Sequence, residues 1–230
     1  MTADNKSVIV YKPPKNTLEA IIKGGTTKGN SSWWHLLSQG FHAGFLLGLA
    51  CGLTIIIAGA LDVSITGTSV AAGVTSTVTY TAKCPTGLKK LLAAAVFPLG
   101  LIVIIFCGAE LFTGNVMYMS CAKMANKTTW KGLAKNWFFT YFGNLCGSLF
   151  VAYFLFHLTK IYEADSYVKY MNTYSTVKCD TYTWGENFLK GWGANYLVCL
   201  AVWGANASED ISGKIFAIWW PLFGFVAIGK

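Results

Sequence analysis

One stretch of the chain places polar side chains inside an otherwise apolar run. Residues 108–115 read Gly-Ala-Glu-Leu-Phe-Thr-Gly-Asn. Glu110 interrupts the apolar run Leu91–Cys107, and apolar sequence resumes from Leu111 to Ala122. Ionisable side chains at membrane depth are costly and mark functional sites. A broken helix also exposes backbone N–H groups that can hold an anion. The pattern predicts a substrate path that passes a broken helix. The alternative is a helix that ends at Cys107 and leads into a surface loop.

Glu110, within this stretch, needs a cation or several N–H donors to stay charged away from water. A bare carboxylate on an anion path would repel the substrate. We therefore expect Glu110 to anchor the loop by facing its backbone rather than the path. Two other polar residues, Asn144 and Asn195, lie in later apolar runs. A single Asn in such a run is more typical of an interhelical hydrogen bond than of a ligand site.

The amino-acid composition predicts the environment in which the chain folds. Of 230 residues, 54% are apolar and only 12% are charged, and the mean hydropathy is +0.47. A soluble domain of this length needs more surface charge, so the chain is predicted to lie in a lipid bilayer. All 18 basic residues are Lys and the net charge is +8. Without Arg, bidentate contacts to phosphate or guanine are missing, which disfavours nucleic acid as a partner.

Five apolar segments predict five membrane crossings, since about 20 apolar residues span a bilayer as a helix. The second is the interrupted one, and the Thr/Ser/Gly-rich residues 64–87 that precede it are predicted to be irregular structure on the outer side. The segments are Phe41–Leu61, Leu91–Cys107 with its continuation to Ala122, Trp137–Leu158, Gly191–Ala207 and Ile215–Gly229.

The lysines orient these segments, because Lys accumulates in cytoplasmic loops. Nine of them precede the first segment or lie between the second and third: Lys6, Lys12, Lys15, Lys23, Lys28, Lys123, Lys127, Lys131 and Lys135. Residues 1–32 are therefore predicted to be a polar cytoplasmic tail, and residues 33–230 a transmembrane domain. The plasma membrane is the expected location.

Glycines predict how two of the segments pack. Gly40, Gly44, Gly48 and Gly52 recur every fourth residue in the first segment, and Gly143 and Gly147 repeat that spacing in the third. This spacing gives a helix face without side chains, which another backbone can approach closely.

The seven cysteines include no CxxC pair, so no metal site is expected. Cys84 and Cys179 both fall on the predicted outer side, which leaves a disulfide between them open. Catalytic signatures such as HExxH or GxSxG are missing from the sequence. The chain is therefore not expected to be an enzyme or to need a cofactor.

From about residue 35 to its end, the chain resembles the formate/nitrite transporter family. The resemblance rests on several motifs in the family's order and spacing: FPLGL at 97–101, GAELFTGN at 108–115, Lys135-Asn136-Trp137, Tyr141-Phe142-Gly143-Asn144 and Asn195–Trp203. It implies an all-α, multi-pass, aquaporin-like fold with a broken second helix. In that family, six helices form two inverted repeats, and five subunits assemble into a homopentamer with one pore each.

The resemblance also implies a function and site residues. The substrates would be small monovalent anions or their acids: formate, nitrite, lactate, acetate or hydrosulfide. Matched residue by residue, the apolar pore constrictions are Leu101, Leu111, Phe112, Val198 and Phe225. The polar loop and pore residues are Glu110, Thr113, Asn115 and Asn195. The vestibule Lys of the family corresponds most nearly to Lys178, one position before the matching place, which Cys179 occupies.

The sequence departs from the family pattern at its end. The family breaks its fifth helix with a loop that carries the central pore His, whereas this sequence stops at Lys230, just before that loop. Only five of the six helices are therefore expected within it. This leaves two readings: a transporter that moves weak-acid anions as a channel or together with protons, or a truncated, non-conducting fragment or assembly subunit.

Overall fold

The computed structural model describes residues 11–61, 63–71, 74–82 and 84–228, and these residues are mostly helical. The helices are α1 (Pro14–Asn30), α2 (Trp33–Ala60), α3 (Thr86–Val96), α4 (Leu99–Phe106), α5 (Phe112–Met124), α6 (Trp130–Phe150), α7 (Asp165–Thr176), α8 (Trp184–Ala207) and α9 (Ile211–Ala227). Two π-helical segments, η1 (Val151–His157) and η2 (Val177–Thr181), continue α6 and α7.

Local sequence signals begin several of these helices. The side chains of Ser32, Thr129 and Asp210 each accept a hydrogen bond from a backbone N–H in the first turn of α2, α6 and α9. Thr183 and Glu186 form a capping box at the start of α8. Such caps satisfy backbone N–H groups that the helix itself leaves unpaired.

The helices include three membrane-spanning candidates by length and composition within the described residues: Trp33–Ala60, Thr86–Phe106 and Trp130–His157. Many large apolar side chains on α6 point outward, among them Phe138, Tyr141 and Leu149, as expected for a surface that faces lipid or another subunit. α9 is apolar but has only 17 residues, and α8 is longer but less apolar. Five crossings therefore stay a prediction.

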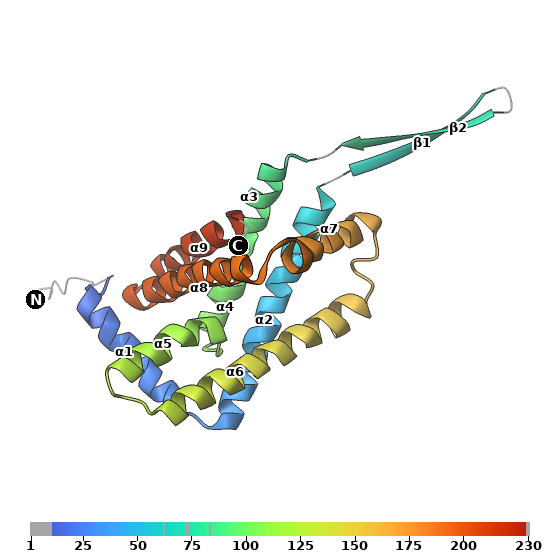
Figure 1. Cartoon of the computed structure of the whole chain (residues 1–230). Helices are drawn as coiled ribbons and strands as arrows, with labels where there is room; N and C mark the ends of the chain where they lie inside the picture. The colour runs from blue at the N-terminus through green and yellow to red at the C-terminus, as the bar shows by residue number, and fades with distance from the viewer. Residues whose placement is uncertain (1–10, 62, 72–73, 83, 229–230) are drawn as a thin grey trace, which may run out of the picture.

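The stretch predicted to be irregular, residues 64–87, instead contains a β-hairpin and the start of α3. Strands β1 (Val63–Ala71) and β2 (Val74–Ala82) pair antiparallel from Val63↔Ala82 to Ala71↔Val74. The prediction was wrong because it weighed the Thr, Ser and Gly residues as loop signals, whereas Thr and the Val residues between them favour extended backbone. In Figure 1 the hairpin extends away from the helices beyond the ends of α2 and α3.

The close backbone approach predicted for the glycine faces is confirmed at Gly40, Gly44, Gly143 and Gly147, and the structure shows that the two faces meet each other, between α2 and α6. A Cβ on Gly40 would lie 3.2 Å from the Cα of Gly143, and one on Gly44 would collide with the carbonyl of Asn144. A Cβ on Gly147 would in turn collide with the carbonyl of Phe41. The two backbones therefore touch where side chains are missing.

Residues 14–30, within the predicted polar tail, form helix α1, which sequence reasoning did not foresee. Its buried residues are Thr17, Ile21, Gly25 and Gly29. A Cβ on Gly25 would collide with the carbonyl of Tyr118, so α1 lies directly against α5. At its start, the N–H of Lys12 donates to the carbonyl of Ala207 at 2.7 Å, which ties the segment before α1 to the end of α8.

Candidate functional site

The predicted break in the second segment lies between α4 and α5. α4 ends in a Schellman motif, in which the N–H of Gly108 donates to the carbonyl of Ile105 and the N–H of Ala109 donates to that of Ile104. Gly108 has φ of +67°, a left-handed conformation that glycine adopts without strain. Ala109, Glu110 and Leu111 then run outside any helix until α5 begins at Phe112.

Glu110 is the buried charge of this loop, with 5% of its surface exposed. Its Oε1 lies 2.7 Å from the Nζ of Lys28 on α1. Its Oε2 accepts a hydrogen bond of 2.7 Å from the Nδ2 of Asn115. The carboxylate is thus neutralised by a lysine from a distant segment, and it anchors the first turn of α5.

Asn144 on α6 holds the backbone of the same loop. Its Nδ2 donates to the carbonyl oxygens of Glu110 (2.9 Å) and Gly40 (2.8 Å), and its Oδ1 accepts from the N–H of Phe112 (2.9 Å). The N–H of Glu110 also donates to the carbonyl of Gln39. The interhelical hydrogen bonding predicted for Asn144 is confirmed. For Asn195 the recorded contact is intrahelical, from Nδ2 to the Sγ of Cys199 at 3.9 Å.

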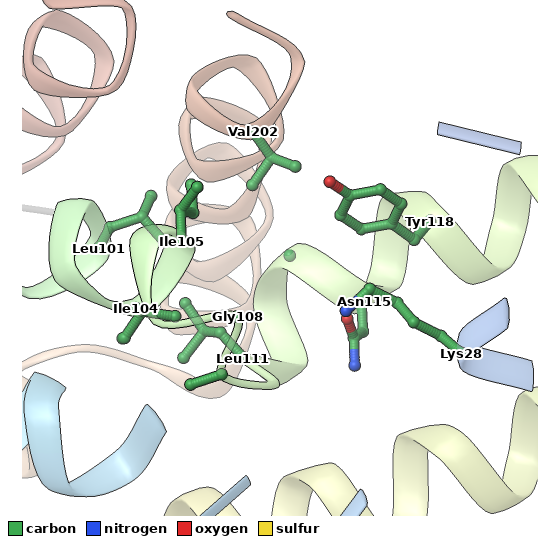
Figure 2. A pocket seen from close by; sticks show the side chains of 11 residues that line it. Lys28, Leu101, Ile104, Ile105, Gly108, Leu111, Asn115, Tyr118 and Val202 are labelled. Atoms are coloured by element: carbon green, nitrogen blue, oxygen red, sulfur yellow. The ribbon is translucent and has the colours of Figure 1, made fainter. Parts of the chain in front are cut away.

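A cavity of about 160 Å³ lies against the break. Figure 2 shows its apolar side chains from α4, α8 and the loop facing the polar side chains of α1 and α5. Its lining comprises Lys28, Leu101, Ile104, Ile105, Gly108, Ala109, Leu111, Gly114, Asn115, Tyr118 and Val202. Lys28 also borders a second, more open groove, together with Lys23, His35 and Glu110. The ion pair therefore adjoins both spaces.

The structure gathers several of the predicted site residues. Leu101 and Leu111 line the cavity and belong to one buried apolar cluster with Val198. Asn115 lines the cavity, and its neighbour Glu110 borders the open groove.

Other predicted site residues are not among those that line the cavity. The ring of Phe112 packs edge-on against Trp137 and Tyr141 of α6, and Phe225 stacks on Phe97. Thr113 and Asn195 do not line the cavity as the structure describes it. The roles predicted for the five constriction residues and for the polar loop and pore residues all stay predictions.

Lys178 lies in η2, away from the cavity, with its Nζ 5.5 Å from the ring of Tyr174. Burial lowers the pKa of Lys178, and the charges of Lys190 on α8 and Lys90 on α3 lower it further. Three lysines from separate elements therefore repel one another here. Cys179 is an exposed free thiol, so the bridge to Cys84 that the sequence left open is not formed in the structure.

Sequence reasoning missed Lys28, Tyr118 and Val202 as site residues. The Nζ of Lys28 lies 5.1 Å from the centre of the Tyr118 ring, and the hydroxyl of Tyr118 accepts a hydrogen bond from Asn206. The available signal was the spacing of the small residues Thr17, Gly25 and Gly29, which lie at multiples of four residues along α1 together with Ile21. No group of three or more His, Cys, Asp or Glu gathers within the described ranges to suggest a metal site.

Apolar helices, one of them broken around a neutralised carboxylate, define an integral membrane protein of the transporter or channel class. The chain belongs to the formate/nitrite transporter family, whose family model matches residues 15–230. It is 43% identical to a probable formate transporter of Methanothermobacter thermautotrophicus over 63% of this chain and 58% of that protein. It is 32% identical to the formate channel BtFdhC of Bacillus thuringiensis over 96% of this chain and 77% of that channel.

Two solved structures share the fold. An FNT family ion channel superposes with a TM-score of 0.74 at 24% identity, covering 94% of this chain and 78% of that one. A pentameric formate channel with formate bound superposes with a TM-score of 0.67 at 27% identity, covering 86% of this chain and 69% of that one. The predicted aquaporin-like fold of this family is thereby confirmed. The chain spans somewhat over half of the length of the Methanothermobacter thermautotrophicus relative.

Proposed function

We propose that the protein moves small monovalent weak-acid anions across a membrane together with a proton, along a path that passes the break between α4 and α5. The observation that carries this proposal is the largely apolar cavity at the break, bordered by the amino end of α5 and by Lys28. Formate is the substrate we favour, because two relatives bear the names of a formate transporter and a formate channel. Nitrite, lactate, acetate and hydrosulfide are further candidates of the same charge and small size.

The apolar wall supports passage of the neutral acid. An anion enters a low-dielectric constriction at a large desolvation cost, and the same surroundings raise the pKa of a weak acid. Leu101, Ile104 and Leu111 supply such surroundings. Because Glu110 is paired with Lys28, its carboxylate does not set up a barrier to an anion. Passage of the acid through the cavity needs no covalent chemistry.

Lys178, with Lys90 and Lys190 near it, is the group that we propose gathers anions before they enter. A cluster of like charges raises the local concentration of an oppositely charged solute. The lysine distribution supports a cytoplasmic N-terminus, and the plasma membrane is the location that we propose. The pentameric formate channel among the structural relatives supports assembly as a homopentamer.

The proposal is tested by uptake of labelled formate into liposomes that contain the protein at its full natural length. Leu111→Glu puts a carboxylate into the cavity wall and is expected to abolish uptake, whereas Leu111→Met should retain it. Phe112→Glu, made in parallel, tests the predicted constriction at the neighbouring position. Wild-type uptake no faster than in protein-free liposomes would overturn the proposal, and undiminished uptake by Phe112→Glu would exclude a constriction there.

A further inference from the structure

The β1–β2 hairpin is a large feature that the transport path does not use. Its two strands pair residue for residue over nine positions, and within the described chain they form a sheet of two strands. Each strand therefore has one edge without a neighbour. Because the hairpin extends away from the helices (Figure 1), the helical bundle does not cover those edges. A two-stranded hairpin alone in water is marginally stable at best.

The sequence of the hairpin leaves both edges able to pair. The strands read VSITGTSVA and VTSTVTYTA, and they contain no charged residue and no proline. Charges, prolines and bulges are the devices by which proteins stop exposed strand edges from pairing. The regular register shows no bulge, and Thr and Val are residues that favour strands. Thr68 and Thr77, which face each other across the hairpin, are exposed.

We propose that these edges pair between copies of this chain, with β2 of one subunit hydrogen-bonded to β1 of the next. Rotational symmetry of the assembly is compatible with this pairing. Copies related by an axis roughly along the strands keep the same strand directions, so β2 of one meets β1 of its neighbour antiparallel. Every copy carries both edges, and neither strand contains a charged residue, so charge repulsion does not oppose their contact.

In the proposed pentamer this pairing would close a ring in which every strand has two neighbours, which removes the open edges altogether. The inference rests on the proposed assembly, because a monomer offers no second copy. The ring would stand as a collar beside the ends of α2 and α3, from which both strands emerge.

Hydrogen exchange of the purified oligomer tests the pairing directly. In an isolated antiparallel hairpin, backbone N–H groups alternate between pointing to the partner strand and pointing to water. The collar predicts that the outward amides of β1 and β2 exchange as slowly as the inward ones. Thr68→Lys combined with Thr77→Lys puts a charge on each strand and should return the outward amides to rapid exchange. Because the two lysines also repel each other within one hairpin, the inward amides must stay slow for the result to report the loss of pairing between copies. Thr68→Ser combined with Thr77→Ser is the matched control and should keep them protected.

Cross-linking supplies an independent test. Copies with Thr68→Cys and copies with Thr77→Cys, carrying different tags, are produced together and treated with a flexible thiol–thiol cross-linker. We expect covalent dimers that carry both tags, above the level given by the seven native cysteines in copies without added cysteine. A pentamer that transports formate but shows fast outward amides and no such dimers overturns this inference alone. A monomeric protein overturns it together with the proposed assembly.

Discussion

Lys28 and Glu110 form an ion pair that joins α1 to the loop between α4 and α5. The nitrogen and oxygen lie 2.7 Å apart, and the two side chains are 20% and 7% exposed. Withdrawing two charges from water is costly, and a good geometry with further hydrogen bonds offsets that cost. Asn115 supplies the second hydrogen bond to the carboxylate. The pair therefore matters mainly because either charge left alone would be strongly destabilising.

Lys28→Met is predicted to lower the free energy of unfolding by about 3–5 kcal/mol, because it leaves the carboxylate of Glu110 buried without a cation. Combining it with Glu110→Gln should recover most of the loss, since the Gln side chain can still accept from Asn115. Thermal unfolding in detergent measures both variants.

Lys12→Met is the matched control, because it breaks a pair of similar length between half-exposed side chains. Lys12 and Glu209 lie 2.8 Å apart and are 32% and 39% exposed. Solvent screens such a pair, so the expected loss is at most about 1 kcal/mol. Equal destabilisation by Lys12→Met and Lys28→Met would contradict the importance assigned to the buried pair.

Lys178 predicts a pH dependence of uptake. Burial and the neighbouring lysines lower its pKa, so it loses its proton, and with it the charge that gathers anions, at a lower pH than an exposed lysine. Lys178→Arg keeps the charge throughout. The ratio of wild-type to Lys178→Arg initial uptake rates at low formate should therefore fall as the external pH rises. Because proton coupling affects both proteins alike, a constant ratio would argue against a role for Lys178.

At the scale of elements, the apolar helices and the break could be predicted from the sequence because their signals are local. Glu110, Gly108 and Asn115 stand out against apolar neighbours, and the glycine spacing shows on the helix itself. α1 was missed because its contact face is built from Thr17, Gly25 and Gly29, which carry no apolar periodicity. Its charged partner at the break is 82 residues away in sequence, so no local pattern reports the pair.

The placement of the constriction residues shows a second limit of sequence reasoning. Leu111 and Phe112 are adjacent, yet one lines the cavity and the other packs against α6. The orientation of Phe112 follows from its place in the first turn of α5 and from Asn144, whose Oδ1 accepts a hydrogen bond from the N–H of Phe112. Both depend on tertiary contacts. The hairpin was missed because Thr and Ser occur in loops as well as in strands.

The contact between α2 and α6 makes a prediction at the same scale. Gly44→Ala and Gly147→Ala each place a methyl group into a backbone carbonyl of the facing helix, and overpacking of this kind costs about 1–3 kcal/mol. Gly191→Ala on α8 meets nothing within 4 Å and should be neutral or slightly stabilising. Thermal unfolding measures the stability of the three variants. Equal stabilities would contradict the close contact between α2 and α6.

At the scale of the whole molecule, the helices surround a largely apolar cavity that lies beside the ion pair of Lys28 and Glu110. α1 is tied near its start to the end of α8 and near its end to the helix break, so a polar N-terminal segment helps to build the site. In the proposed mechanism this cavity belongs to the substrate path, with the lysines near Lys178 outside it and the neutralised carboxylate of Glu110 beside it. Such a passage favours the neutral form of a weak acid over its anion.

Proton-linked passage of formate is the central claim, and simultaneous measurement of formate and proton entry tests it most directly. Liposomes containing the protein at its full natural length and an internal pH indicator receive labelled formate, with protein-free liposomes as the baseline for formic acid that crosses lipid. We predict that protein-dependent formate entry is matched by acidification of the lumen and is unaffected by an imposed membrane potential. Formate entry that follows the membrane potential, without acidification above the baseline, would contradict the account.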